Sequence, residues 1–167
     1  MADGRTNEFG LAPEVVFNSC AETVIVTFTT GLLPGSTCPA PSVSAWYRHQ
    51  FDRLDFTVQA FGGAPRLFGA GVTASYRVVD QPRFTFAPEV GAGFLWAHVA
   101  LPTSFALSDR LWWYVEPSVG IRRYEAVRLG TGLWWQGASG VALGAEVGGG
   151  FLNEPQVDVA VLVGFAF

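Results

Sequence analysis

One stretch of this chain gathers the three residue types that a serine hydrolase uses. His98, Ser104 and Asp109 fall within residues 97–109, which read as a long loop. A hydrolase needs a nucleophile within about 3 Å of a base, and that base is oriented by an acid. Ser and Asp are also ordinary loop residues, so we favour the interpretation of 97–109 as a loop without catalysis. With two separated histidines and no Cys/His ligand spacing, the sequence predicts no metal site and no cofactor.

Cys20 and Cys38 are the only cysteines, and an oxidising compartment would permit a disulfide between them. If residues 21–30 cross a membrane as a strand, the ends of that strand lie about 30 Å apart at 3.3 Å per residue. A disulfide needs Cα atoms within about 7 Å of each other. Three alternatives stay open: the cysteines are free, residues 1–20 reach the same side as Cys38, or 21–30 is not a membrane strand.

The elements that would position these residues are clearest at the end of the chain. In residues 157–167 every odd position is Val or Phe, while the even positions are Asp158, Ala160, Leu162, Gly164 and Ala166. A period of two predicts a strand with two different faces. Gly and Ala do not make a solvent-facing side, but they suit the narrow interior of a barrel whose exterior touches lipid.

The same alternation continues upstream and predicts an all-β fold, a closed antiparallel transmembrane barrel with up-and-down connections and about eight strands. We place the barrel over 21–167 and leave 1–20 outside it as a plug, a docking peptide or a tail. Gly130-Thr131-Gly132 reads as a turn. The expected strands are 21–30, 42–50, 54–61, 67–78, 83–96, 111–128, 133–151 and 157–167.

Charged residues recur on the faces that point into this barrel. Buried charges persist when they are paired, so we expect carboxylate–guanidinium bridges across the lumen. We interpret this network as a filling of the barrel rather than a gated pore or proton path. Its members are Arg48, Arg77, Glu89, Glu116, Arg122, Glu146 and Asp158. Aromatic residues near strand ends are expected outside, at the membrane interface, namely Trp96, Trp113, Trp135 and Phe167.

Composition agrees with a membrane location. Of the 167 residues 50% are hydrophobic and 14% charged, against about 25% charged in typical soluble domains. The net charge of −4 argues against nucleic acid as a partner. A membrane helix over 133–151 is disfavoured by its six glycines. The sequence opens with Met-Ala-Asp-Gly-Arg and lacks the apolar core of a secretory signal, so we interpret Met1 as a start placed before a mature N-terminus.

The alternating last strand that ends on Phe167 resembles the C-terminal signature of bacterial outer-membrane β-barrels. The resemblance covers residues 21–167. It implies a location in the Gram-negative outer membrane, in contact with lipopolysaccharide and other outer-membrane lipids. Two enzymes of similar size belong to that class. The lipid A deacylase uses a His-x-Ser motif, which His49-Gln50-Phe51 and His98-Val99-Ala100 do not match. The palmitoyltransferase has a histidine in its first outer loop, and residues 31–41 contain none.

The functional hypothesis is therefore a non-enzymatic barrel without a wide pore. It would act as a scaffold, an anchor or a surface-loop binder, and another envelope protein would contact its outer loops or residues 1–20. One alternative is a lipid A-modifying hydrolase or acyltransferase acting at the outer loops. A second alternative is a soluble, lipocalin-like barrel that binds a ligand.

Overall fold

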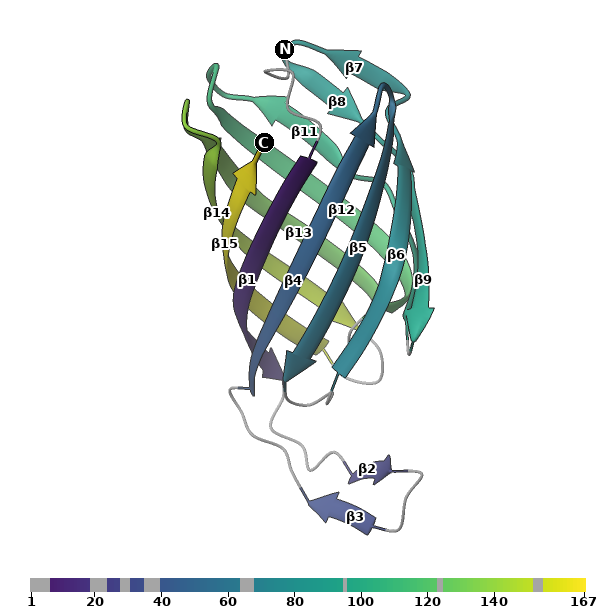
Figure 1. The fold of residues 1–167 in the computed structure, drawn as a ribbon. Coiled ribbons are helices and arrows are strands. Elements are labelled where there is room, and N and C mark those ends of the chain that lie inside the picture. Colours follow the sequence, from purple (N-terminus) through teal and green to yellow (C-terminus); the bar gives the residue numbers. More distant parts are fainter. Residues whose placement is uncertain are drawn as a thin grey trace.

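The computed structural model describes residues 7–18, 24–27, 31–34, 40–63, 68–94, 96–122, 125–151 and 155–167, and these form an all-β protein (Figure 1). The strands are β1 (Asn7–Asn18), β2 (Val24–Thr27), β3 (Gly31–Pro34), β4 (Ala40–Phe51), β5 (Leu54–Gly63), β6 (Phe68–Tyr76), β7 (Val79–Gln81), β8 (Phe84–Phe86), β9 (Glu89–Phe94), β10 (Trp96–Ala100), β11 (Thr103–Ala106), β12 (Leu111–Arg122), β13 (Glu125–Gln136), β14 (Val141–Phe151) and β15 (Pro155–Ala166).

Thirteen of these strands form one antiparallel sheet that closes on itself. Successive full-length strands pair side by side, β1 pairs with β15, and the pairing of β10 with β12 completes the ring. Because β7 continues β6, β8 runs into β9 and β10 runs into β11, the ring contains ten full-length strands. The closed antiparallel barrel expected from the alternation is confirmed, with ten strands instead of about eight.

The first strand of the barrel is β1, so the expectation that residues 1–20 stay outside the barrel is wrong for 7–18. β1 lies between β4 and β15, with Glu8 opposite Arg48 and Ala166. At the seam, Asn7 and Phe167 exchange two backbone hydrogen bonds of 3.2 and 2.9 Å. The sequence did not predict this strand because it contains Pro13, and proline is rare within central strands. In the structure the pairing with β15 is interrupted at 12–13, where Pro13 has no N–H to donate.

The expected strand 21–30 is not part of the barrel. Its residues 24–27 form β2, which pairs only with β3 in a separate two-stranded sheet. Figure 1 shows this hairpin beyond the end of the barrel that lies opposite the two termini. Cys20 and Cys38 lie outside the described residues.

Two stretches that were expected to be turn or loop are strand. Residues 97–109, expected to be a loop, contain most of β10 and all of β11. Along β10 the side chains alternate between buried and exposed, as they do in a strand of the barrel wall. Gly130-Thr131-Gly132 lies inside β13. A Cβ at Gly132 would lie 2.7 Å from the Tyr114 hydroxyl. These glycines therefore make room for neighbouring side chains and do not mark a turn.

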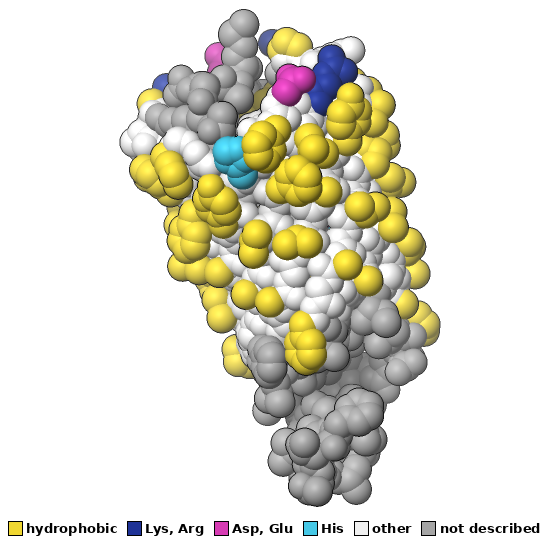
Figure 2. All heavy atoms as spheres, turned by 45° about the vertical axis from the view of Figure 1, so that its right-hand side comes forward, with side chains coloured by type: hydrophobic (Ala, Val, Ile, Leu, Met, Phe, Trp, Pro, Cys, Tyr) yellow, Lys and Arg dark blue, Asp and Glu magenta, His cyan; other side chains and the backbone are white. Residues whose placement is uncertain are grey.

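The two faces of the barrel wall differ sharply. Along β15, Val157, Val159, Val161, Val163 and Phe165 are exposed, whereas the residues between them are buried or half-buried. Figure 2 shows hydrophobic side chains spread over the outer wall, with the visible charged ones near one end. No helix in the described part of the chain is long and apolar enough to cross a membrane.

Candidate functional site in the barrel lumen

The lower lumen, toward the β2–β3 hairpin, contains an ion-pair network around Arg128. Arg128 on β13 donates from Nη2 and Nε to the Asp158 carboxylate of β15, at 2.7 and 3.2 Å. Its Nη2 also pairs with Glu146 of β14. The Tyr114 hydroxyl donates to Glu146 at 2.5 Å. The side chains of Arg128 and Asp158 are only 5% and 1% exposed, so this is a buried charge network spanning four adjacent strands.

Glycines on the wall provide the space for this guanidinium. A Cβ on Gly130 or Gly148 would overlap the Nη atoms of Arg128, and one on Gly148 would lie 2.5 Å from Asp158 Oδ1. Both glycines are buried and face the lumen. The absence of side chains at these two positions therefore leaves space beside the wall for the Arg128 guanidinium, which reaches both carboxylates.

A second buried group lies where β9 meets β10. His98 Nε2 lies 2.9 Å from Glu89 Oε1, and the His98 side chain is fully buried. The Trp96 ring packs edge-on against His98, with ring centroids 4.8 Å apart. Trp96 was expected on the outer face, and this is wrong. It pairs with Gly93, and paired residues point to the same side of a sheet, so the turn between β9 and β10 directs Trp96 inward.

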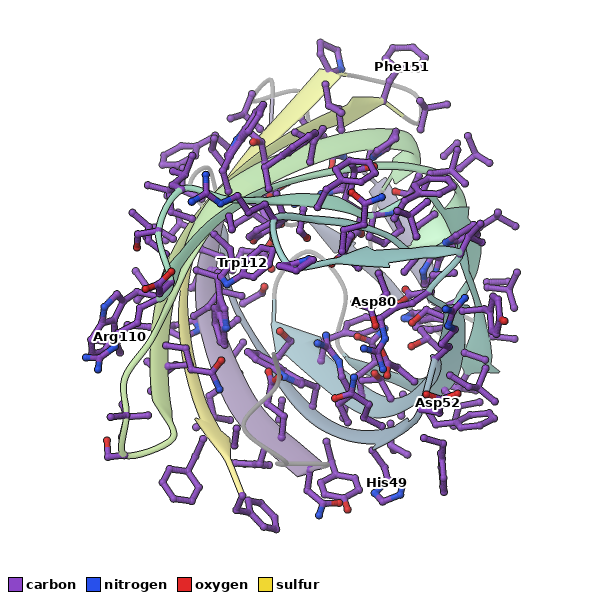
Figure 3. All side chains as sticks on the ribbon, turned by 90° about the horizontal axis from the view of Figure 1, so that it is seen from above. His49, Asp52, Asp80, Arg110, Trp112 and Phe151 are labelled. Carbon is purple, nitrogen blue, oxygen red and sulfur yellow. The ribbon has the colours of Figure 1, made fainter. Side chains whose placement is uncertain are left out.

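The upper lumen, toward the termini, holds a cavity of about 440 Å³. Arg48 lies 3.6 Å from Glu8 and is 46% exposed, in contrast to buried Arg128. Trp46 Nε1 donates to the other Glu8 oxygen at 3.1 Å. Arg77 lies 3.5 Å from Asp55 and 3.1 Å from Asp80. Figure 3, viewed from the end with the termini, shows Trp112 and Asp80 within the ring of strands, and His49 and Phe151 outside it.

The three residues considered for catalysis are not brought together. His98 is buried beside Glu89 in the lower lumen. Ser104 lines the upper cavity, six residues further along and roughly 20 Å away at 3.3 Å per residue. Asp109 is exposed in the turn between β11 and β12. A base, a nucleophile and an acid spread in this way are too far apart to act together, so these three candidates do not form one catalytic triad.

Most of the residues expected in the lumen do face it. Arg48, Arg77, Glu89, Glu116 and Glu146 line the cavity, and Asp158 lies buried beneath it. Arg122 belongs to β12, and its side chain lies outside the described part. The sequence analysis missed Arg128, the central cation, along with inward Glu8, Glu14 and Asp55. Arg128 was placed at the end of a strand because the glycine pair that follows it was taken for a turn.

The remaining predicted aromatics lie on the outer face, near the end with the termini. Trp113, Trp135 and Phe167 are exposed. Trp113 stacks on Phe105 with ring centroids 5.3 Å apart, and Phe165 stacks on Phe167 at 6.1 Å. Among the described residues no group of three or more potential ligands could hold a metal ion.

The fold and its lumen therefore define a closed up-and-down β-barrel with a polar, partly filled interior and an apolar exterior. No protein-family model matches the chain, and no similar curated protein was found.

Among solved structures, the chain is similar to a mutant of Rh. blastica porin, with a TM-score of 0.42 and 20% identity over 76% of this chain. It spans 44% of that porin chain, less than half its length. It is also similar to a structure described as de novo design of transmembrane beta-barrels, with a TM-score of 0.47 and 12% identity. That match covers 96% of this chain and 95% of the designed one.

Proposed function

We propose that this protein is a non-conducting barrel of the bacterial outer membrane that acts as an anchor for a surface-exposed segment. The observation that carries this proposal is the outward face of the ten strands. Valine, leucine and phenylalanine side chains stay exposed along β1, β4, β5, β9, β12, β13, β14 and β15. Exposing so many large apolar side chains to water is unfavourable, but hydrocarbon removes that cost. A soluble lipocalin-like barrel would instead carry polar residues there.

Buried side chains in the lower lumen support the absence of a wide pore. Below the cavity, the lumen is occupied by the Arg128 network and, on other strands, by buried Phe61, Trp96 and His98. Because Arg128 is held by two carboxylates, an ion would have to displace a buried, paired guanidinium in order to pass. Ten strands are close to the roughly eight at which side chains fill the interior, and well below the roughly sixteen at which an open channel remains.

The orientation follows from the even strand number. Both termini lie at one end of the barrel (Figure 1), and in single-chain outer-membrane barrels this is the periplasmic end. The β2–β3 hairpin at the other end would then face outward. It pairs with itself and not with the barrel sheet, so it is available to contact lipopolysaccharide or another envelope protein.

Two measurements test the proposal on the whole chain. A membrane barrel refolded in detergent migrates faster on a gel before boiling than after it, and it precipitates when detergent is withdrawn. In planar bilayers the folded protein should give no stepwise conductance. A protein that stays monomeric in buffer without detergent would overturn the membrane location. Stable single-channel steps would overturn the closed lumen while leaving the location intact.

A further inference from the structure

The cavity in the upper lumen has the size and the mixed lining of a small-molecule site. Its volume of about 440 Å³ falls within the roughly 300–1,000 Å³ that is typical of ligand pockets. Strands from all around the barrel line it, including β1, β4, β5, β8, β12, β13 and β14. Its floor is formed by the paired side chains of Arg128 and Glu146.

Negative charge exceeds positive charge in this lining. It contains the carboxylates Glu8, Asp55, Glu89, Glu116 and Glu146 and the guanidiniums Arg48, Arg77 and Arg128. Each of the three arginines has one of these carboxylates as a partner. Even with His98 protonated beside Glu89, the described lining counts five carboxylates against four cations. The cavity therefore attracts cations and repels anions.

Aromatic rings form part of the same wall. Trp46, Trp112, Tyr114 and Trp134 all line the cavity. The Trp46 indole covers Gly10, where a Cβ would overlap three of its ring atoms. The Trp134 indole covers Gly164 in the same way, with a Cβ 2.9 Å from the ring. Glycine leaves room at these two positions for a ring close to the wall, and an indole face that is open to the lumen attracts cations.

From these features we infer that the upper lumen binds an organic cation, an amine with an apolar body. The ammonium group would lie among the carboxylates, with Glu116 above the Arg128–Glu146 floor, and the apolar body would lie on the indole faces. Bare metal ions fit less well, because they need converging oxygen ligands, and the described residues hold no metal-binding group. This inference does not depend on the membrane location, since the cavity belongs to the barrel itself.

Three ligands of one shape and different charge test the inference. Benzylammonium, benzyl alcohol and benzoate are titrated by calorimetry into the whole protein, refolded in non-ionic detergent at low salt. We expect saturable binding of benzylammonium, about tenfold weaker binding of the alcohol, and none of benzoate. No saturable binding of benzylammonium at millimolar concentration would overturn the inference. The same holds if benzyl alcohol or benzoate binds as tightly as benzylammonium.

Adjacent residues on opposite faces provide matched variants. Trp112→Leu removes an inward indole and should weaken benzylammonium binding about fivefold, whereas Trp113→Leu removes an outward one and should leave it unchanged. Glu116→Gln should weaken it about tenfold, with Asp109→Asn in an exposed turn as the charge control. Equal effects of the inward variants and their controls would contradict the assignment. Faster migration before boiling identifies the folded variants, so a failure to bind remains distinguishable from a failure of the barrel.

Discussion

Replacing Arg128 with methionine tests whether the buried ion-pair network stabilises the barrel. The substitution keeps an unbranched side chain but removes both donors to Asp158, a carboxylate that is 1% exposed. It also removes the guanidinium from Glu146, which retains the Tyr114 hydroxyl. Breaking a buried pair by removing one partner costs about 3–5 kcal/mol, because an uncompensated charge is left behind. We expect a loss of that size in the free energy of unfolding at neutral pH.

The measurement is equilibrium unfolding by urea of the protein refolded into lipid vesicles, followed by tryptophan fluorescence. Arg48→Met is the matched control, because Arg48 is 46% exposed and lies 3.6 Å from Glu8. An exposed pair contributes at most about 1 kcal/mol. Adding Asp158→Leu to the Arg128 variant should recover part of the loss, since it removes the orphaned carboxylate. If Arg128→Met costs no more than Arg48→Met, the network does not stabilise the barrel and the reasoning is refuted.

Three further outcomes are expected. Gly148→Ala should destabilise the barrel by about 1–3 kcal/mol because its methyl group displaces the Arg128–Asp158 pair, whereas Gly149→Ala, with its nearest neighbour 3.7 Å away, should change the urea midpoint little. Brominated lipids should quench Trp113 but not the inward indoles, so Trp113→Phe should reduce the quenched fraction and Trp112→Phe should not; equal reductions would contradict the assigned faces. Replacing residues 20–38 with a short Gly/Ser turn should preserve heat-modifiable migration, because β2 and β3 pair outside the barrel sheet; loss of that migration would show that the hairpin is needed for closure.

The alternation of residue types was sufficient to predict a barrel with an apolar exterior. It is unambiguous in β15, where bulky residues occupy one face and small or acidic ones the other. β1 was not predicted, because it contains Pro13 and a proline in a strand removes one backbone donor. That loss is tolerated where the neighbouring strand does not need the donor. The tolerance is visible only in the pairing of β1 with β15, which is interrupted at residues 12–13.

The interior was predicted less well, because side-chain packing inside a barrel depends on register between strands. Gly130 was read as a turn residue although its role is to leave space for Arg128. A glycine inside an otherwise alternating strand marks either a turn or a close approach, and local sequence does not distinguish the two. Trp96 illustrates the same limit, because a hairpin turn changes which residues face inward, and a turn that is overlooked reverses the assignments that follow it in the same predicted strand.

The pairing of β1 with β15 has a consequence for how this protein is made. These two strands share nine residue pairs at the seam, yet they stand at opposite ends of the chain. The sheet can therefore close only after residues 155–167 have been synthesised, and every shorter nascent chain carries two unpaired edges. Such edges invite pairing with other chains, and contacts of the longest sequence separation form slowly. The nascent chain must therefore be kept from pairing with other copies of itself until β15 pairs with β1.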